Sequence, residues 1–236
     1  RGYLAGASVG NYALFAGGGA TPRSTVDAYD TSLTRSTPTA LSAGRFNLAG
    51  ASVGNYALFA GGATSSSERS TVDAYDTFLT RSTPTALSQA RSSLAGASVG
   101  NYALFAGGYG GSYHNTVDAY DISLTRSTPT ALSQARSSLA GASVGNYALF
   151  AGGTRSVYTQ STVDAYDTSL TRSTPTALSQ SRGYLAGASV GNYALFAGGC
   201  DDSDSYDTVD AYGPPVPEAR LYMPIGTKYK FGESEK

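Results

Sequence analysis

The chain of 236 residues contains no tryptophan, one cysteine, one histidine and one methionine. The single cysteine, Cys200, excludes a disulfide within the chain and a zinc site built on cysteines. The longest apolar runs, such as YALFA, are far shorter than the roughly 20 residues that a membrane-spanning helix needs. We therefore expect no membrane insertion and no structural metal or cofactor.

The chain also lacks a charge of dominant sign. Its 16 basic and 17 acidic residues nearly cancel, and within each complete repeat two framework arginines balance two framework aspartates. All three lysines lie in the last nine residues. Because no basic stripe remains, nucleic acid and anionic membrane surfaces are not expected partners.

A repeat dominates what is present. The string GNYALFAGG occurs five times, beginning at Gly10, Gly54, Gly100, Gly145 and Gly191. The period, measured between equivalent arginines, is 44, 46, 45 and 46 residues. All of this variation falls between the double glycine and the next Thr-Val, where the inserts read GATPRS, ATSSSERS, YGGSYHN, TRSVYTQS and CDDSDSYD. A period of this size indicates one supersecondary unit per repeat.

Each unit has the pattern of four short strands and no helical periodicity. In the second unit the predicted strands are 48–53, 56–61, 71–75 and 81–87, and Gly54-Asn55 forms a hairpin turn between the first two. Small residues in the first strand suit the crowded inner edge of a ring. Pro84 places the fourth strand at the outer edge, because proline removes a ladder donor. These features predict a β-propeller.

The unit RSSLAGASVGNYALFAGG followed by TVDAYD, residues 91–108 and 116–121, resembles a kelch repeat. The resemblance covers about nine-tenths of the chain and departs from the kelch pattern in the fourth strand, where a tryptophan is usual. The near-identical units are also similar to those of uncharacterised kelch-like proteins of gut bacteria and their phages. The resemblance implies a ring of four-stranded blades.

Five units predict an all-β, five-bladed propeller over residues 1–213 and a C-terminal tail over residues 214–236. The fifth unit departs from the repeat after Tyr212 and continues as GPPVPEARLYMPIG. Its outer strand could come from residues 220–225 or from a segment that precedes Arg1; we favour the tail. We also expect the tail to join the propeller to a larger parent chain or assembly.

The sequence offers few candidates for catalysis. His114 is the only histidine and lies in one insert, and nothing in the spacing of the sequence indicates a Ser-His-Asp arrangement. The repeated aspartates, Asp73 and its equivalents, are expected to form an ion pair between blades with the framework arginines. The acidic insert at 200–207 lacks the glycine and glutamate of a calcium loop. We therefore predict a protein that is not an enzyme and holds no metal.

The opening arginine of each unit has two open interpretations. It either pairs with an aspartate inside the fold or lines the mouth of a pocket, as arginines near this point often do in related kelch domains that bind acidic ligands. The residues concerned are Arg1, Arg45, Arg91, Arg136 and Arg182.

The predicted binding surface lies at one end of the ring. Strand alternation sends the inserts and the varied pair after each opening arginine to the same end, and the constant Gly-Asn turns to the other. Tyrosine, serine, glycine and asparagine at the varied end are typical of adaptable contact surfaces. The candidate residues are Tyr3, Arg23, Phe46, Asn47, Glu68, Arg69, Tyr109, Tyr113, His114, Arg155, Tyr158, Gln160, Tyr184, Asp202, Asp204 and Tyr206.

These observations favour a recognition module that binds a cell-surface glycan or protein, in a phage appendage or a bacterial surface protein, and hence an extracellular or virion-associated location. A structural spacer in a virion or surface layer is the alternative. A glycan-active or oxidase-type propeller enzyme is the third possibility, and it would need a metal or a carboxylate pair near the ring axis.

Overall fold

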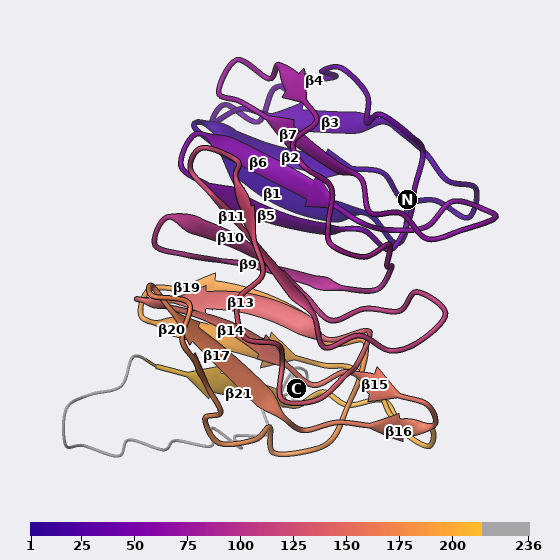
Figure 1. The fold of residues 1–236 in the computed structure, drawn as a ribbon, viewed down its shortest axis with the longest axis vertical. Coiled ribbons are helices and arrows are strands. Elements are labelled where there is room, and N and C mark those ends of the chain that lie inside the picture. Colours follow the sequence, from indigo (N-terminus) through magenta and orange to yellow (C-terminus); the bar gives the residue numbers. More distant parts are fainter. Residues whose placement is uncertain (214–236) are drawn as a thin grey trace, which may run out of the picture.

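A computed structural model describes residues 1–213 of the chain, and in that range all regular structure is β-strand. Apart from a two-stranded hairpin in one insert, the strands form five antiparallel sheets that follow one another in chain order, from the indigo first sheet to the orange and yellow fifth (Figure 1). The predicted five-bladed β-propeller is confirmed. Four blades have four strands, and the fifth has three within the described residues.

The blades have nearly identical strand bounds. Blade 1 consists of β1 (Ala5–Val9), β2 (Tyr12–Ala16), β3 (Val26–Tyr29) and β4 (Arg35–Ser36). Blade 2 consists of β5 (Ala49–Val53), β6 (Tyr56–Ala60), β7 (Val72–Tyr75) and β8 (Arg81–Ser82). Blade 3 consists of β9 (Ala95–Val99), β10 (Tyr102–Ala106), β11 (Val117–Asp121) and β12 (Arg126–Ser127). Blade 4 consists of β13 (Ala140–Val144), β14 (Tyr147–Ala151), β17 (Val163–Asp167) and β18 (Arg172–Ser173), and its insert adds β15 (Thr154–Arg155) and β16 (Tyr158–Thr159). Blade 5 consists of β19 (Ala186–Val190), β20 (Tyr193–Ala197) and β21 (Val209–Tyr212).

The first three predicted strands of each blade match the structure to within a residue at either end. The fourth is much shorter than predicted: β8 covers two residues, whereas the sequence suggested 81–87. Pro84 explains the difference, because proline cannot donate to the ladder. As expected, β8 lies at the outer edge of its sheet, in the order β5-β6-β7-β8.

The inner strands pack closely on one another. A Cβ atom at Gly50 would lie 2.2 Å from the carbonyl oxygen of Gly6, so only glycine fits there. Next to this contact the Ser52 hydroxyl donates to the Ser8 carbonyl oxygen at 2.6 Å, and the Ser8 amide donates back to the Ser52 hydroxyl at 3.1 Å. The same pair of bonds repeats through Ser98 and Ser143 to Ser189. We call this series the serine ladder.

The core lies between the blades, where two different sheet faces meet. The aliphatic face of a blade carries alanine, valine and leucine, represented in blade 2 by Val53, Leu58 and Val72. It packs on the aromatic face of the next blade, where Phe105 and Tyr120 of blade 3 are fully buried. Equivalent clusters join blades 1 and 2, 3 and 4, and 4 and 5.

Each terminal blade leaves one face uncovered. Phe15, on the aromatic face of blade 1, is 39% exposed, whereas its equivalent Phe59 in blade 2 is 0% exposed. Val190, on the aliphatic face of blade 5, is 59% exposed, whereas Val53 is 3% exposed. All five residues of β19 are exposed. Within residues 1–213, therefore, blades 1 and 5 do not pack on each other as the internal blades do.

The two proposals for the outer strand of blade 5 lie outside the described residues, since one falls on residues 220–225 and the other on a segment before Arg1. The predicted connecting role of the tail, residues 214–236, lies outside them as well.

Candidate functional site

The opening arginines of blades 2 to 5 are buried inside the blades. Arg91 is 0% exposed, lies 2.9 Å from the Asp118 carboxylate and donates to the Phe105 carbonyl oxygen at 3.0 Å. A second framework arginine, Arg126, approaches the other oxygen of Asp118 at 3.3 Å. Ser88, which lies in the segment between β8 and Arg91, donates its hydroxyl to the same carboxylate at 3.0 Å.

Of the two interpretations of the opening arginines, this arrangement overturns the pocket mouth for blades 2 to 5. The side chains of Arg45, Arg91, Arg136 and Arg182 are all 0% exposed, and each pairs with an aspartate of its own blade. The expected ion pair therefore forms within a blade, and the hydrogen bond from serine links that pair to the preceding connection. Burial lowers the pKa of Arg91, and Asp118 acts against this by favouring the charged form.

Blade 1 carries the same pair in a more open setting. Arg1 pairs with Asp27, and the two side chains are 19% and 15% exposed. Arg35 also pairs with Asp27 at 2.5 Å and is 54% exposed. The exposed aromatic face of blade 1 explains the difference, since no preceding blade covers this aspartate within the described residues.

The inserts lie at the end of the propeller where the sequence analysis placed them. In blades 2 to 5 the residue directly after the opening arginine forms a β-bridge with the first residue of the insert: Phe46 with Ala63, Ser92 with Tyr109, Ser137 with Thr154, and Gly183 with Cys200. The insert of blade 4 forms a small hairpin, β15–β16, which projects at the right of Figure 1. We call this end, formed by the five inserts and the varied pairs, the insert end.

One position in each insert is held by the same backbone hydrogen bond, and in the first four blades by a second one. In blade 3 the His114 amide donates to the Gly108 carbonyl oxygen at 2.9 Å, and the His114 carbonyl accepts from the Arg136 amide at 3.0 Å. The first of these bonds recurs in all five blades and the second in the first four. We call these positions the outer row: Arg23, Arg69, His114, Gln160 and Tyr206. The backbone is therefore constant here while the side chain changes.

A second row lies next to it and links neighbouring blades. The Asn47 amide donates to the Tyr3 carbonyl oxygen at 2.9 Å, and the Ser93 amide donates to the Asn47 carbonyl oxygen at 2.9 Å. Ser138 and Tyr184 continue the series. All five residues have φ between 52° and 61°, a conformation that non-glycine residues seldom adopt. We call them the inner row: Tyr3, Asn47, Ser93, Ser138 and Tyr184.

The side chains of these rows differ in exposure. Tyr3 and Tyr184, at the two ends of the inner row, are 68% and 71% exposed. In the outer row Arg23 and Arg69 are exposed, whereas Gln160 and Tyr206 are half-buried. Both rows therefore present different side chains to solvent from backbone positions that the framework fixes.

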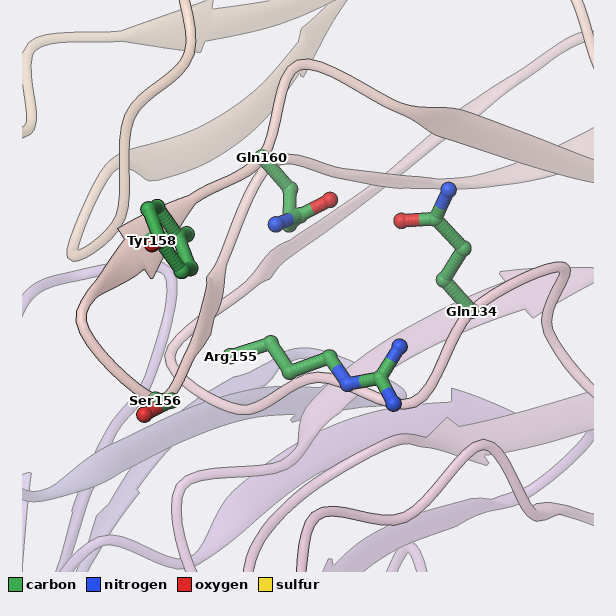
Figure 2. Close-up of a pocket in the computed structure, with 5 residues that line it drawn as sticks. All are labelled: Gln134, Arg155, Ser156, Tyr158 and Gln160. Atoms are coloured by element: carbon green, nitrogen blue, oxygen red, sulfur yellow. The ribbon is translucent and has the colours of Figure 1, made fainter.

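An open pocket of about 490 Å³ lies beside the insert of blade 4. Figure 2 shows the polar ends of Gln134, Gln160 and Arg155 directed toward one space, with the ring of Tyr158 at its side. Ser156 completes the lining. Two amides, a guanidinium group and an aromatic ring together offer donors, acceptors and a stacking surface, which suits a polar ligand such as a sugar or a peptide.

The insert of blade 3 forms an aromatic cluster. The rings of Tyr109 and Tyr113 meet edge to face with centroids 5.3 Å apart. His114 follows them and its Nε2 atom is buried. Burial lowers the pKa of His114, and the positive charge of Arg91 lowers it further. The imidazole is therefore mainly neutral at neutral pH.

The acidic insert of blade 5 is organised by its own hydrogen bonds. The Tyr206 hydroxyl donates to the Asp201 carboxylate at 2.5 Å, and the amides of Ser203 and Asp204 donate to the same carboxylate. The hydrogen bond from Tyr206 is the main cause of the lowered pKa of Asp201. Asp202 and Asp204 are exposed. In residues 1–213 no three acidic, histidine or cysteine side chains gather as metal ligands would.

The remaining predicted residues also lie at the insert end. Phe46 and Glu68 are half-buried beside Ala63, with which both form β-bridges. Gln134 was not among the predicted residues, because it lies outside the inserts and the varied pairs, at a position where Gln89 and Gln180 are its equivalents. Ser93 and Ser138 were not among them either, since the backbone bonds that complete the inner row join residues about 45 positions apart.

Within the described part of the chain, no helix has the length and hydrophobicity needed to cross a bilayer.

Comparison with known proteins identifies the fold. The solved structure of YjhT is similar to this protein, with a TM-score of 0.71 over 84% of this chain and 72% of that chain, at 13% sequence identity. No protein-family model matches the chain. No curated protein matches it in sequence. At this identity the likeness shows the propeller fold alone.

Proposed function

We propose that this protein is a non-enzymatic recognition module that binds a cell-surface glycan or protein through its insert end. The observation that carries the proposal is the pair of rows at that end. Ten backbone positions are fixed by repeated hydrogen bonds, and their side chains range over arginine, histidine, glutamine, asparagine, serine and tyrosine. A rigid support with differing side chains limits the entropy lost on binding.

The framework itself supports a role without catalysis. The repeated carboxylates of Asp73, Asp118 and Asp164 are 0% exposed and are paired with arginines, so they are not available to a substrate as acids or bases. The chemically varied side chains lie at the insert end, where they are open to a macromolecular surface.

The setting that we propose is a phage appendage or a bacterial adhesin, outside the cell or on a virion. The kelch-like pattern of the units and their similarity to kelch-like proteins of gut bacteria and their phages support this setting. In the same proposal residues 214–236 join the propeller to a larger chain or assembly.

Binding of the purified chain to a glycan array and to intact gut bacteria tests the proposal. The key variant has all five inserts replaced by Gly-Ser sequences of equal length. The matched control replaces the asparagine of each of the five Gly-Asn turns at the opposite end with serine and keeps the glycine, which holds the positive φ of the turn. We expect the insert variant to lose binding and the turn variant to keep it. Binding that survives insert replacement would contradict the proposal.

A structural spacer is a second candidate, and one observation favours it: the uncovered faces of blades 1 and 5 are suited to assembly. A spacer would bind neither glycans nor cells, and replacement of its inserts would leave its assembly unchanged.

A further inference from the structure

The two uncovered faces are the two halves of the interface that joins the blades. Blade 1 presents an aromatic face with Ala13, Phe15 and Tyr29, which correspond to Ala57, Phe59 and Tyr75. In blade 2 those three residues are 0% exposed against the aliphatic face of blade 1. The aromatic face of blade 1 thus has the chemistry to receive an aliphatic face.

Blade 5 presents the complementary half. Its aliphatic face carries Ala188, Val190 and Val209, and the two valines are 59% and 43% exposed. Their equivalents in blade 2, Val53 and Val72, are 3% and 1% exposed against blade 3. The opposite face of blade 5 is buried as usual, with Phe196 at 0% exposure against blade 4.

The serine ladder is open at the same two places. In each internal contact the hydroxyl of the later serine donates to the carbonyl of the earlier one and accepts from its amide. In residues 1–213 no carbonyl accepts the Ser8 hydroxyl, and no hydroxyl accepts the Ser189 amide. The Ser8 hydroxyl therefore lacks the partners that the Ser189 backbone offers, a carbonyl oxygen to accept from it and an amide to donate to it.

From these three observations we propose that the chain assembles head to tail, with the aliphatic face of blade 5 of one copy packed on the aromatic face of blade 1 of a second copy. Within residues 1–213 the two faces do not meet, since Phe15 and Val190 are both exposed. A second copy offers each face its complementary half. Because the contact joins two different surfaces, it produces either a closed ring of copies or an open array.

This contact is weaker than an internal one for a reason visible in the sequence. Between blades 1 and 2 the Tyr75 hydroxyl donates to the Thr39 carbonyl oxygen at 2.7 Å, and Ser42 donates to Asp73. The sequence after Tyr212 has no counterpart of this Thr-Ala-Leu-Ser segment. Assembly should therefore depend on protein concentration.

Sedimentation velocity of the full 236-residue chain, from micromolar to millimolar concentration, tests the proposal. The average mass should rise above that of the monomer with increasing concentration. Phe15→Asp and Val190→Asp should each weaken association at least about a hundredfold, because each substitution places an unpaired charge in the contact between two copies, where it becomes buried. Phe78→Asp is the matched control, since Phe78 is 87% exposed in the turn between β7 and β8.

Mixing the two variants makes the test specific. Each variant keeps the face that the other has lost, so an equimolar mixture of Phe15→Asp and Val190→Asp should form dimers although each alone stays monomeric. Ala13→Glu and Val209→Asp replace them if circular dichroism shows either variant to be unfolded. A wild-type chain that remains monomeric at every concentration, a mixture that remains monomeric, or an equal effect of Phe78→Asp would overturn the proposal.

Discussion

Arg91 and Arg155 carry the same side chain in two regions of the molecule with opposite surroundings. Arg91 belongs to the constant framework, where it is 0% exposed and bonded to Asp118 and to the Phe105 carbonyl. Arg155 belongs to an insert, where it is exposed and lines an open pocket. Residue type alone therefore does not identify a binding residue in this repeat. An arginine of the framework stabilises the fold, whereas an arginine of an insert is available for contact.

The largest difference between these regions should appear on truncation of the two arginines. Arg91→Ala leaves the carboxylate of Asp118 buried with Arg126 as its remaining cation and Ser88 as a hydrogen-bond donor, and should cost about 3–5 kcal/mol of unfolding free energy. Arg155→Ala removes an exposed side chain and should change that free energy by less than about 0.5 kcal/mol. Urea denaturation of both variants measures this difference, and equal losses would refute it.

A second contrast lies within the framework, between covered and uncovered blade faces. Phe105→Ala removes a ring that is 0% exposed and should cost about 3–5 kcal/mol. Phe15→Ala removes the equivalent ring of blade 1, which is 39% exposed, and should cost about 1–2 kcal/mol. Thermal and urea unfolding at low protein concentration, where copies do not associate, compares the two. Equal costs would mean that blade 1 is covered in solution.

A smaller effect separates two framework tyrosines. The Tyr120 hydroxyl donates to the Thr85 carbonyl oxygen of the preceding connection at 2.7 Å, whereas no carbonyl of the described residues accepts from Tyr29. Tyr120→Phe should therefore cost about 1 kcal/mol, and Tyr29→Phe close to none. Unfolding midpoints in urea provide the measurement. Loss of stability in Tyr29→Phe would indicate a partner for its hydroxyl.

The smallest effect concerns pH and the insert of blade 3. Burial and Arg91 lower the pKa of His114 in the folded state, so the unfolded chain binds the proton more readily. The contribution of His114 to stability is therefore fully present above about pH 6.5, and it is lost as the pH falls from there through the folded-state pKa. A proton NMR titration of His114 measures that pKa, and His114→Gln should remove this part of the pH dependence. A pKa at or above the ordinary value would contradict the account.

The sequence predicted the fold because the fold is repeated. Alternation in AGASV, YALFA and VDAY defined three strands per unit, and Pro84 placed the fourth at the edge. The sequence pattern did not predict how short the fourth strand is, since pairing at a sheet edge depends on individual hydrogen bonds. Nor did it decide between the two roles of the opening arginines, because burial depends on how the preceding connection covers each aspartate.

The candidate site was predicted in part for a similar reason. Variation among units pointed to the insert end, where Tyr3, His114 and Tyr158 lie. The two rows were not evident, because the outer row is defined by backbone hydrogen bonds made by inserts of different sequence and the inner row by hydrogen bonds between blades. Gln134 was missed because it lies outside the inserts and enters the pocket through its position beside a neighbouring insert.

We propose that the framework holds the backbone and that the inserts determine what is bound. The most direct test exchanges the insert of blade 2, residues 63–70, with that of blade 4, residues 154–161, which has the same length. The exchange keeps the composition and charge of the chain. The account predicts an unchanged unfolding midpoint and a loss of binding to the cells or glycans that the wild-type chain recognises. Full binding by the exchanged chain would contradict it.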